Sequence, residues 1–218
     1  MLQKLLELLF PPKCVLCKGI LAKDETDFCH ICRKHAPEFK KSNLRFSFVA
    51  GWTSVWYYKD MVRGSIHRYK FSGRRNYAAA YGRVLAMKLQ KEGMDDFDIL
   101  TYVPTAFFRR MRRGYDQMEL LCNAVGAELG VSPVKSLRKV RNTPPQSGIQ
   151  DVSRRRANVL GAYRFCDPEV LRGKRILLLD DVITTGATVS ECARVLLTAG
   201  AKEVFCACVA VTEHKTKM

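Results

Sequence analysis

The chain has 218 residues, 47% of them hydrophobic, which is enough to bury a core in one medium-sized domain with a small additional module. Lysine and arginine outnumber aspartate and glutamate by 37 to 21, and the formal charge of +16 favours polyanionic partners such as phosphates or nucleic acid. No run of 18 or more apolar residues occurs, which excludes a membrane-spanning helix, and we expect no membrane insertion.

The first ten residues, Met1 to Phe10, carry leucines at helical spacing, with Lys4 and Glu7 among them. The segment is too short and too charged for a secretory signal. We expect a short amphipathic helix that covers another part of the protein. The nine cysteines of the chain are odd in number and unevenly spaced, which favours a reducing compartment over a disulfide framework.

Two Cys-x-x-Cys pairs stand eleven residues apart near the N-terminus. The four residues of these pairs are Cys14, Cys17, Cys29 and Cys32. Four thiolates complete the tetrahedral shell of a structural zinc ion and leave no open position for catalysis. Redox-active dithiols are the alternative, but they usually occur as a single pair at a helix start. We therefore predict a zinc module within residues 1–42, with His30 and His35 as spectators.

Strands and helices alternate along the rest of the chain, after a polar linker at residues 38–43. Apolar runs predict strands at 51–58, 98–103, 175–179 and 204–211. Helix-period apolar positions predict helices at 61–71, 77–90, 115–129 and 188–198. This alternation is typical of the α/β class, in which helices cover both faces of a parallel sheet. We place a domain boundary near residue 42, which divides the chain into 1–42 and 43–218.

The most informative stretch is a buried strand that ends in Asp180 and Asp181 and turns into a helix. Main-chain amides of such a turn and the positive helix terminus form a cradle for a phosphate. The predicted cradle residues are Thr184, Thr185, Gly186, Ala187 and Thr188. Adjacent strand residues face opposite sides, so one acid can reach sugar hydroxyls or hydrated magnesium while the other braces the loop. An ordinary turn with capping threonines gives no reason for paired acids.

Residues 103–117 are densely basic, and guanidinium groups suit a multiply charged leaving group. The arginines concerned are Arg109, Arg110, Arg112 and Arg113. Upstream, Arg68 and Lys70 at a predicted helix end contact either a phosphate or only solvent, and both alternatives stay open. Tyr69 and Phe71 beside them suit stacking on single-stranded bases, although aromatic residues at helical spacing more often belong to a core.

In chain order, these features resemble the ComF family, which is named for competence protein F. The resemblance rests on the cysteine module, residues 66–75, 112–117, 143–146 and 154–158, and the Asp-Asp loop. That loop resembles the phosphoribosyl pyrophosphate (PRPP) signature of type I phosphoribosyltransferases, and residues 138–146 together with 154–158 resemble the mobile hood loop of amidophosphoribosyltransferases. One departure is Asp116, where relatives usually carry asparagine, and it puts the role of this residue in doubt.

The resemblance implies a type I phosphoribosyltransferase-like domain that binds PRPP with magnesium. It further implies a cytoplasmic bacterial protein that handles single-stranded DNA with competence proteins during natural transformation. Asp180 and Asp181 would hold the ribose hydroxyls as catalytic residues, and the 184–188 cradle would hold the 5-phosphate. The remaining implied PRPP contacts are Arg109, Arg112, Arg113, Lys70 and Arg141.

A transferase with these parts would release pyrophosphate from C1 through an oxocarbenium-like transition state, to an acceptor that the sequence does not identify. The main alternative is a non-catalytic nucleic-acid adaptor that uses the PRPP site as a sensor or nucleotide-binding pocket. A third alternative is a structural partner protein whose loop binds only adventitious anions. The fold does not decide among them, because function depends on the site.

Overall fold

The structure is a computed structural model that describes residues 10–40, 42–143 and 152–213. Four strands form a sheet in the order β1-β6-β5-β2, and every neighbouring pair is parallel. These strands are β1 (Gly51–Tyr57), β2 (Ile99–Tyr102), β5 (Arg175–Ile183) and β6 (Glu203–Val211). A separate two-stranded antiparallel sheet of β3 (Leu137–Lys139) and β4 (Tyr163–Phe165) lies beside the four-stranded sheet.

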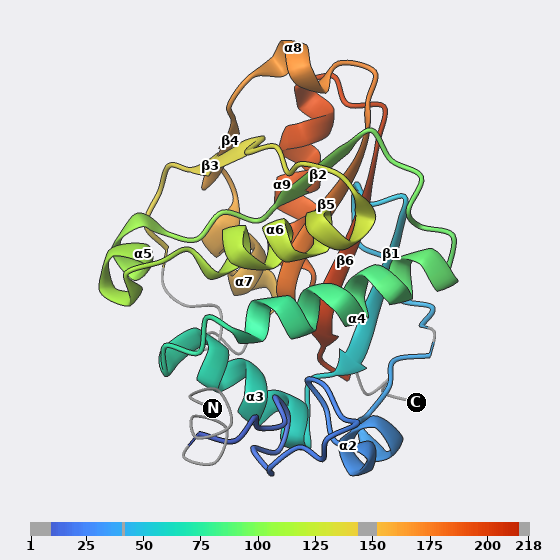
Figure 1. Ribbon diagram of the computed structural model, residues 1–218. Helices are drawn as coiled ribbons and strands as arrows, with labels where there is room; N and C mark the ends of the chain where they lie inside the picture. Colours follow the sequence, from blue (N-terminus) through green and yellow to red (C-terminus); the bar gives the residue numbers. More distant parts are fainter. Residues whose placement is uncertain (1–9, 41, 144–151, 214–218) are drawn as a thin grey trace, which may run out of the picture.

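Helices cover both faces of the sheet, and Figure 1 shows α4 and α6 in front of it and α9 behind it. Leu177 and Leu179 of β5 pack against α3, α4 and α6, whereas Ile176 and Leu178 pack on the face that carries α9 and the β3–β4 sheet. The helices are α2 (His30–His35), α3 (Asp60–Phe71), α4 (Tyr77–Lys91), α5 (Phe107–Arg113), α6 (Gln117–Leu129), α7 (Val152–Val159), α8 (Pro168–Leu171) and α9 (Ala187–Thr198). The predicted α/β class is confirmed.

Several local predictions were wrong. The strand expected to end at 179 continues to Ile183, because β6 pairs with it through Val211. The basic residues 103–117 contain the helix α5, for which no helix was predicted, and the next helix starts at Gln117 instead of Tyr115. Residues 154–158, expected in a mobile loop, lie in α7. The strands β3 and β4 were missed because three-residue strands that each contain a central arginine carry no apolar pattern.

The cysteine module is packed into the body of the protein. Its buried Leu16 and Phe28 belong to the same apolar cluster as Trp56 of β1, and the Phe28 and Trp56 rings meet edge to face at 5.7 Å. The following segment pairs with β1, where the Phe39 amide donates to the Val55 carbonyl at 3.0 Å. The polar linker is thus partly held by the sheet. The helix predicted at the N-terminus lies in residues 1–9, outside the described residues.

Candidate functional site

The four cysteines of the two Cys-x-x-Cys pairs converge on one point. Their Sγ atoms all lie within 4.8 Å of one another, and those of Cys17 and Cys29 are 3.8 Å apart. Tetrahedral zinc with bonds of about 2.3 Å requires sulfurs separated by about 3.8 Å, so the cluster fits zinc. The amides of Gly19 and Cys29 donate to the Cys17 and Cys14 sulfurs at 3.3 and 3.4 Å, which stabilises thiolates. His30 instead lies 3.1 Å from a Glu25 carboxylate.

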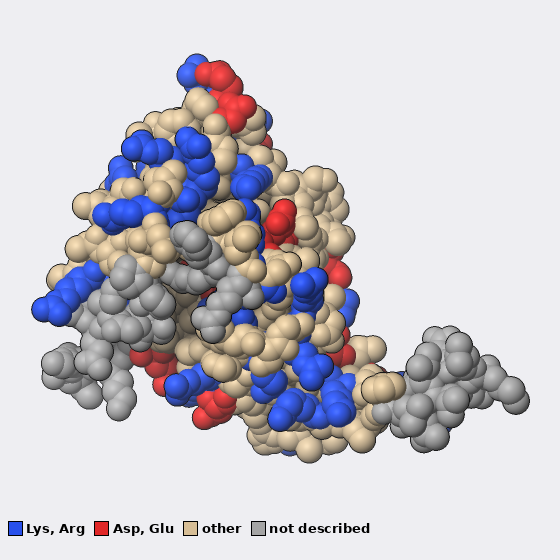
Figure 2. Space-filling model, turned by 90° about the vertical axis from the view of Figure 1, so that its left-hand side faces the viewer, with Lys and Arg blue, Asp and Glu red and all other residues tan. Residues whose placement is uncertain are grey.

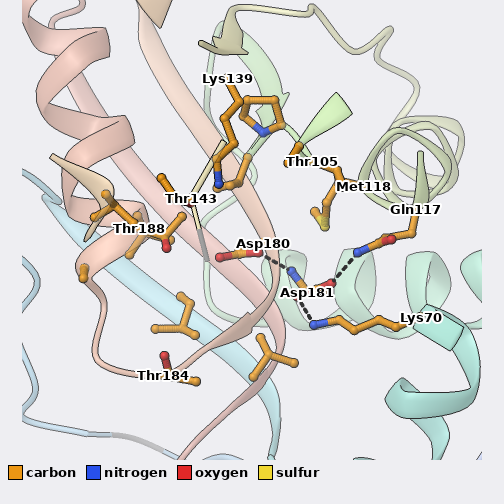
Figure 3. A pocket seen from close by; sticks show the side chains of 18 of the residues that line it. Lys70, Thr105, Gln117, Met118, Lys139, Thr143, Asp180, Asp181, Thr184 and Thr188 are labelled. Carbon is orange, nitrogen blue, oxygen red and sulfur yellow. Dashed lines mark hydrogen bonds and ion pairs between the residues drawn. The ribbon is translucent and has the colours of Figure 1, made fainter. Parts of the chain in front are cut away.

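A second site is a cavity of about 290 Å³ at the carboxyl ends of β2 and β5 (Figure 3). Its walls come from the end of α3, the loop after β2, the start of α6, the β3–β4 sheet and the turn between β5 and α9. The polar and charged side chains that line it are Lys70, Thr105, Arg113, Gln117, Lys139, Thr143, Asp180, Asp181, Thr184, Thr185 and Thr188. Most of these groups are donors or cations, so the cavity suits an anion.

Asp181 is a buried acid on the α3 and α6 side of the sheet, with 6% of its surface exposed. Lys70 Nζ lies 2.8 Å from its Oδ1, and Gln117 Nε2 donates to its Oδ2 at 3.2 Å. Figure 3 shows both contacts. The ion pair offsets the cost of burying the carboxylate, and it fixes the end of β5 against two helices. Lys70, open between phosphate and solvent in the sequence, thus contacts an acid at the cavity.

Asp180 extends to the opposite face of β5. Its Oδ1 accepts the main-chain amide of Asp181 at 2.8 Å, and Figure 3 shows Lys139 reaching into the cavity above it. Burial, and then the negative charge of Asp181, raise the pKa of Asp180 well above its usual range, against the opposing effect of Lys70 and Lys139. A carboxyl group in this position gains from a hydroxyl donor or a cation. The two acids therefore have the distinct environments expected from strand alternation.

The predicted phosphate cradle borders the cavity along its whole length, and residues 184–188 all line it. Gly186 has φ +75°, and a Cβ at this position would stand 2.1 Å from the Phe46 ring, so any other residue would be strained and would displace that ring. The helix α9 begins directly afterwards at Ala187. The first amides of a helix have no partner within it, and its dipole is positive at this end, which makes the turn suited to a phosphate.

The predicted pyrophosphate arginines occupy different places. Arg113 lines the cavity, contacts the Gln117 side-chain oxygen and lies over the Phe71 ring at 5.0 Å. Arg109 and Arg112 belong to α5, and their side chains lie outside the described residues.

Arg141, an implied PRPP contact, binds two main-chain carbonyls. Its guanidinium donates to the carbonyls of Asn158 and Leu160 at 3.0 and 2.8 Å, which ties the strand end to the end of α7. It is not among the described residues that line the cavity. Residues 144–146 of the predicted hood segment lie outside the described residues.

Lys139 and Gln117 line the cavity and were not predicted in it, and neither was the packing of Phe46 against its glycine turn. Lys139 is two positions after the buried Leu137, so strand alternation turns it to the same side, but the strand itself was not recognised. Gln117 stood in the family motif without an assigned role. Phe46 had no signal, because its contact with Gly186 joins segments that are far apart in the chain.

Asp116 is the N-cap of α6. Its Oδ1 accepts the Met118 amide and the Thr105 hydroxyl, both at 3.0 Å. An asparagine oxygen accepts the same bonds, so the departure from the family pattern preserves the cap. Of the aromatic residues in doubt, Tyr69 is core, at 1% exposure, whereas Phe71 is 63% exposed at the cavity mouth.

Comparisons with known proteins place this geometry in a family. Residues 85–218 match the phosphoribosyl transferase domain, and residues 5–43 match the double zinc ribbon domain. A DNA utilization protein, YhgH, of Salmonella typhimurium is 30% identical over 91% of this chain and 97% of its own length. Competence protein F of Haemophilus influenzae is 24% identical over 88% of this chain and 93% of its own length. The chain belongs to the ComF family.

Among solved structures, this ComF family member is similar to a glutamine PRPP amidotransferase from B. subtilis complexed with ADP and GMP. The two are 22% identical with a TM-score of 0.44, over 65% of this chain and 30% of that one. Within residues 10–40, 42–143 and 152–213, no helix has the length and apolar character needed to cross a bilayer.

Proposed function

We propose that the cavity binds PRPP together with magnesium. The observation that carries the proposal is the meeting of an acid pair, a glycine turn at a helix start and three cationic side chains around one cavity of about 290 Å³. A sugar that bears both a phosphate and a pyrophosphate needs hydrogen-bond acceptors for its hydroxyl groups at the centre of the site, and cations or amides at both ends. The cations are Lys70, Lys139 and Arg113.

Each part of the site has a proposed role. The turn at 184–188 holds the 5-phosphate, and Asp180 accepts the ribose hydroxyls. Asp181, held by Lys70 and Gln117, fixes the carboxyl end of β5. Arg113 binds the pyrophosphate, and the proposal extends the same role to Arg109 and Arg112 of α5. Magnesium, when bound, neutralises pyrophosphate charge, and the acid pair provides the carboxylate oxygens that this ion prefers.

Calorimetric titration with PRPP and magnesium tests the proposal. The wild-type chain is expected to bind only when magnesium is present, and the double change Asp180→Asn with Asp181→Asn is expected to abolish binding. A matched control is Asp95→Asn with Asp96→Asn, an exposed acid pair of which Asp96 contacts Arg175 at the start of β5, and it should bind like the wild type. Equal heats from the wild type and the cavity double variant would exclude this cavity as the PRPP site.

A phosphoribosyl transfer is separated from a sensor by its products. With an acceptor present, a transferase releases pyrophosphate in proportion to the PRPP consumed, and a sensor retains PRPP unchanged. The chain supplies electrostatic stabilisation for the departing pyrophosphate through Arg113 and Lys139. Pyrophosphate release, measured with nucleobases, ammonia and single-stranded DNA as acceptors, distinguishes the two functions.

Handling of single-stranded DNA is a second proposed function. Figure 2 shows lysine and arginine side chains gathered on the face that carries the β3–β4 sheet and α5. Arg138 and Arg164 stand directly opposite each other on β3 and β4, and both are exposed. Like charges in such a pair are destabilising by up to about 1 kcal/mol unless an anion lies between them. A polyanion bound along this face would relieve the repulsion between the two arginines.

Binding of a single-stranded oligonucleotide at several salt concentrations tests this second function. Affinity is expected to fall steeply with salt, by roughly 0.7 units of logarithmic slope for each phosphate contacted. Arg138→Gln with Arg164→Gln should reduce that slope, whereas Arg172→Gln, which removes a charge already paired with Glu169 at the end of α8, should not. A flat salt response would exclude the basic face as a nucleic-acid surface.

We further propose a cytoplasmic location. All nine cysteines are free thiols, and a four-thiolate zinc site requires reduced cysteines. Fractionation of the producing cells should therefore find the protein with cytoplasmic markers. Recovery with oxidised cysteines from an extracellular fraction would contradict this location.

A further inference from the structure

The helix α3 contacts both the zinc module and the cavity. On the module side, Ser65 Oγ donates to the Val15 carbonyl at 2.6 Å. Arg68 Nη2 donates to the carbonyls of Val15 and Leu16 at 2.9 and 2.6 Å. Val15 and Leu16 are the two residues enclosed by the first Cys-x-x-Cys pair, so these carbonyls belong to the turn that presents two of the zinc thiolates.

The next residues of the same helix hold the cavity. Lys70 forms the ion pair with Asp181, and the Tyr69 hydroxyl donates to the main-chain carbonyl of Gln117. Gln117 in turn donates its side-chain amide to Asp181. Both groups that fix Asp181 are therefore bound to α3, one directly and the other through Tyr69.

Short distance along the helix makes this connection stiff. Arg68 and Lys70 are two residues apart, which corresponds to about 3 Å along the helix axis. Arg68 is also held at its other side by Tyr77, whose ring centroid lies 5.9 Å from the guanidinium carbon. A shift of the zinc turn therefore changes the position of the helix end that carries Lys70.

We propose that Arg68 is a positioning residue that couples the zinc turn to the PRPP cavity. Zinc fixes the peptide between Cys14 and Cys17, Arg68 and Ser65 fix α3 to that peptide, and α3 places Lys70 and Tyr69 for Asp181 and Gln117. The inference rests on the proposed PRPP function. It assigns the zinc module a part in ligand affinity although no residue of the module lines the cavity among those described.

The chain provides a matched control in Arg83. This arginine also clamps the module to the body, with its Nε and Nη2 donating to both carboxylate oxygens of Asp27 at 2.7 and 2.6 Å. It belongs to α4, a helix that contributes no residue to the cavity. Arg68 and Arg83 therefore both hold the module in place, but only Arg68 lies on the helix that holds Asp181.

The experiment compares Arg68→Gln, Arg68→Lys and Arg83→Gln with the wild-type chain, by zinc content, thermal unfolding and calorimetric PRPP affinity with magnesium. We expect all four to retain zinc. We expect both glutamine variants to unfold at lower temperature, and only Arg68→Gln to lose affinity, by about tenfold. Arg68→Lys should recover part of that affinity, because one ammonium reaches one of the two carbonyls. Unchanged affinity in Arg68→Gln, or an equal loss in Arg83→Gln, overturns the coupling.

A measurement on the intact wild-type chain covers the case in which Arg68→Gln does not fold. Coupling between two sites is reciprocal, so saturating PRPP and magnesium should tighten zinc against a competing chelator. Arg83→Gln should show the same tightening. No tightening in a wild-type chain that binds PRPP overturns the coupling alone, whereas absence of PRPP binding overturns the proposed function and the coupling with it.

Discussion

The zinc cluster and the cavity differ in how far apart their parts lie in the chain. The zinc ligands all fall between residues 14 and 32, and two short spacings bring them together. The cavity is lined by residues from Tyr58 to Val189, contributed by helices, strands and loops from both faces of the sheet. A local motif with one ligand atom type is complete in the sequence, whereas a composite cavity depends on how the sheet brings distant segments together.

The largest expected effect is loss of the zinc cluster. Cys32→Ser removes a buried thiolate, and we expect a chain without zinc that loses the apparent binding free energy of the ion, on the order of 10 kcal/mol. Cys166→Ser changes an exposed cysteine outside the cluster and should retain full zinc content. Zinc content and circular dichroism measure both. A folded Cys32→Ser chain with full zinc would show that the module does not depend on four thiolates.

The next effect tests whether the cavity depends on distant contacts. Gly186→Ala introduces a Cβ that meets the Phe46 ring, at a backbone φ of +75°, and we expect a loss of about 3 kcal/mol from strain and overpacking together. Gly173→Ala has a similar φ of +71° but no atom within 4 Å of the added group, so about 1 kcal/mol is expected. Denaturant unfolding compares them, and equal losses would mean that Phe46 does not press on the turn.

The ion pair at the cavity floor should show a similar or smaller effect. Lys70→Met leaves the Asp181 carboxylate buried with one partner, and we expect a loss of about 3 kcal/mol in the free energy of unfolding. Adding Asp181→Asn should restore part of it, because the amide carries no charge to compensate. A double-mutant cycle by denaturant unfolding gives the coupling. Strict additivity of the two changes would show that the pair is not formed.

The smallest effect separates family pattern from physical role at Asp116. Asp116→Asn keeps an acceptor for the Met118 amide and should change the free energy of unfolding by less than about 0.5 kcal/mol. Asp116→Ala removes the cap of α6 and the Thr105 contact, so about 1 kcal/mol is expected. Thermal unfolding of the two variants measures the difference. Equal destabilisation would mean that the negative charge, and not the cap, is what matters.

The sequence alone determined the features that depend on nearby residues. The spacing of Cys14, Cys17, Cys29 and Cys32 was sufficient for zinc, since the ion selects four thiolates at the end of two tight turns. Alternating apolar periods were sufficient for the α/β class, and the acid pair before a glycine turn marked residues 184–188, which line the cavity. The zinc and turn signals are each contained in fewer than about 20 consecutive residues, and each apolar period is local to one strand or helix.

Only the tertiary structure decided which cations face the cavity and which bind elsewhere. The sequence does not distinguish five cations of the chain, Arg68, Lys70, Arg113, Lys139 and Arg141. In the structure they contact, in that order, two carbonyls of the zinc module, a buried acid, an aromatic ring, the cavity and the end of α7. A long cationic side chain reaches whichever acceptor the packed elements bring near it. That choice is made by contacts between segments distant in the chain, and no local spacing encodes it.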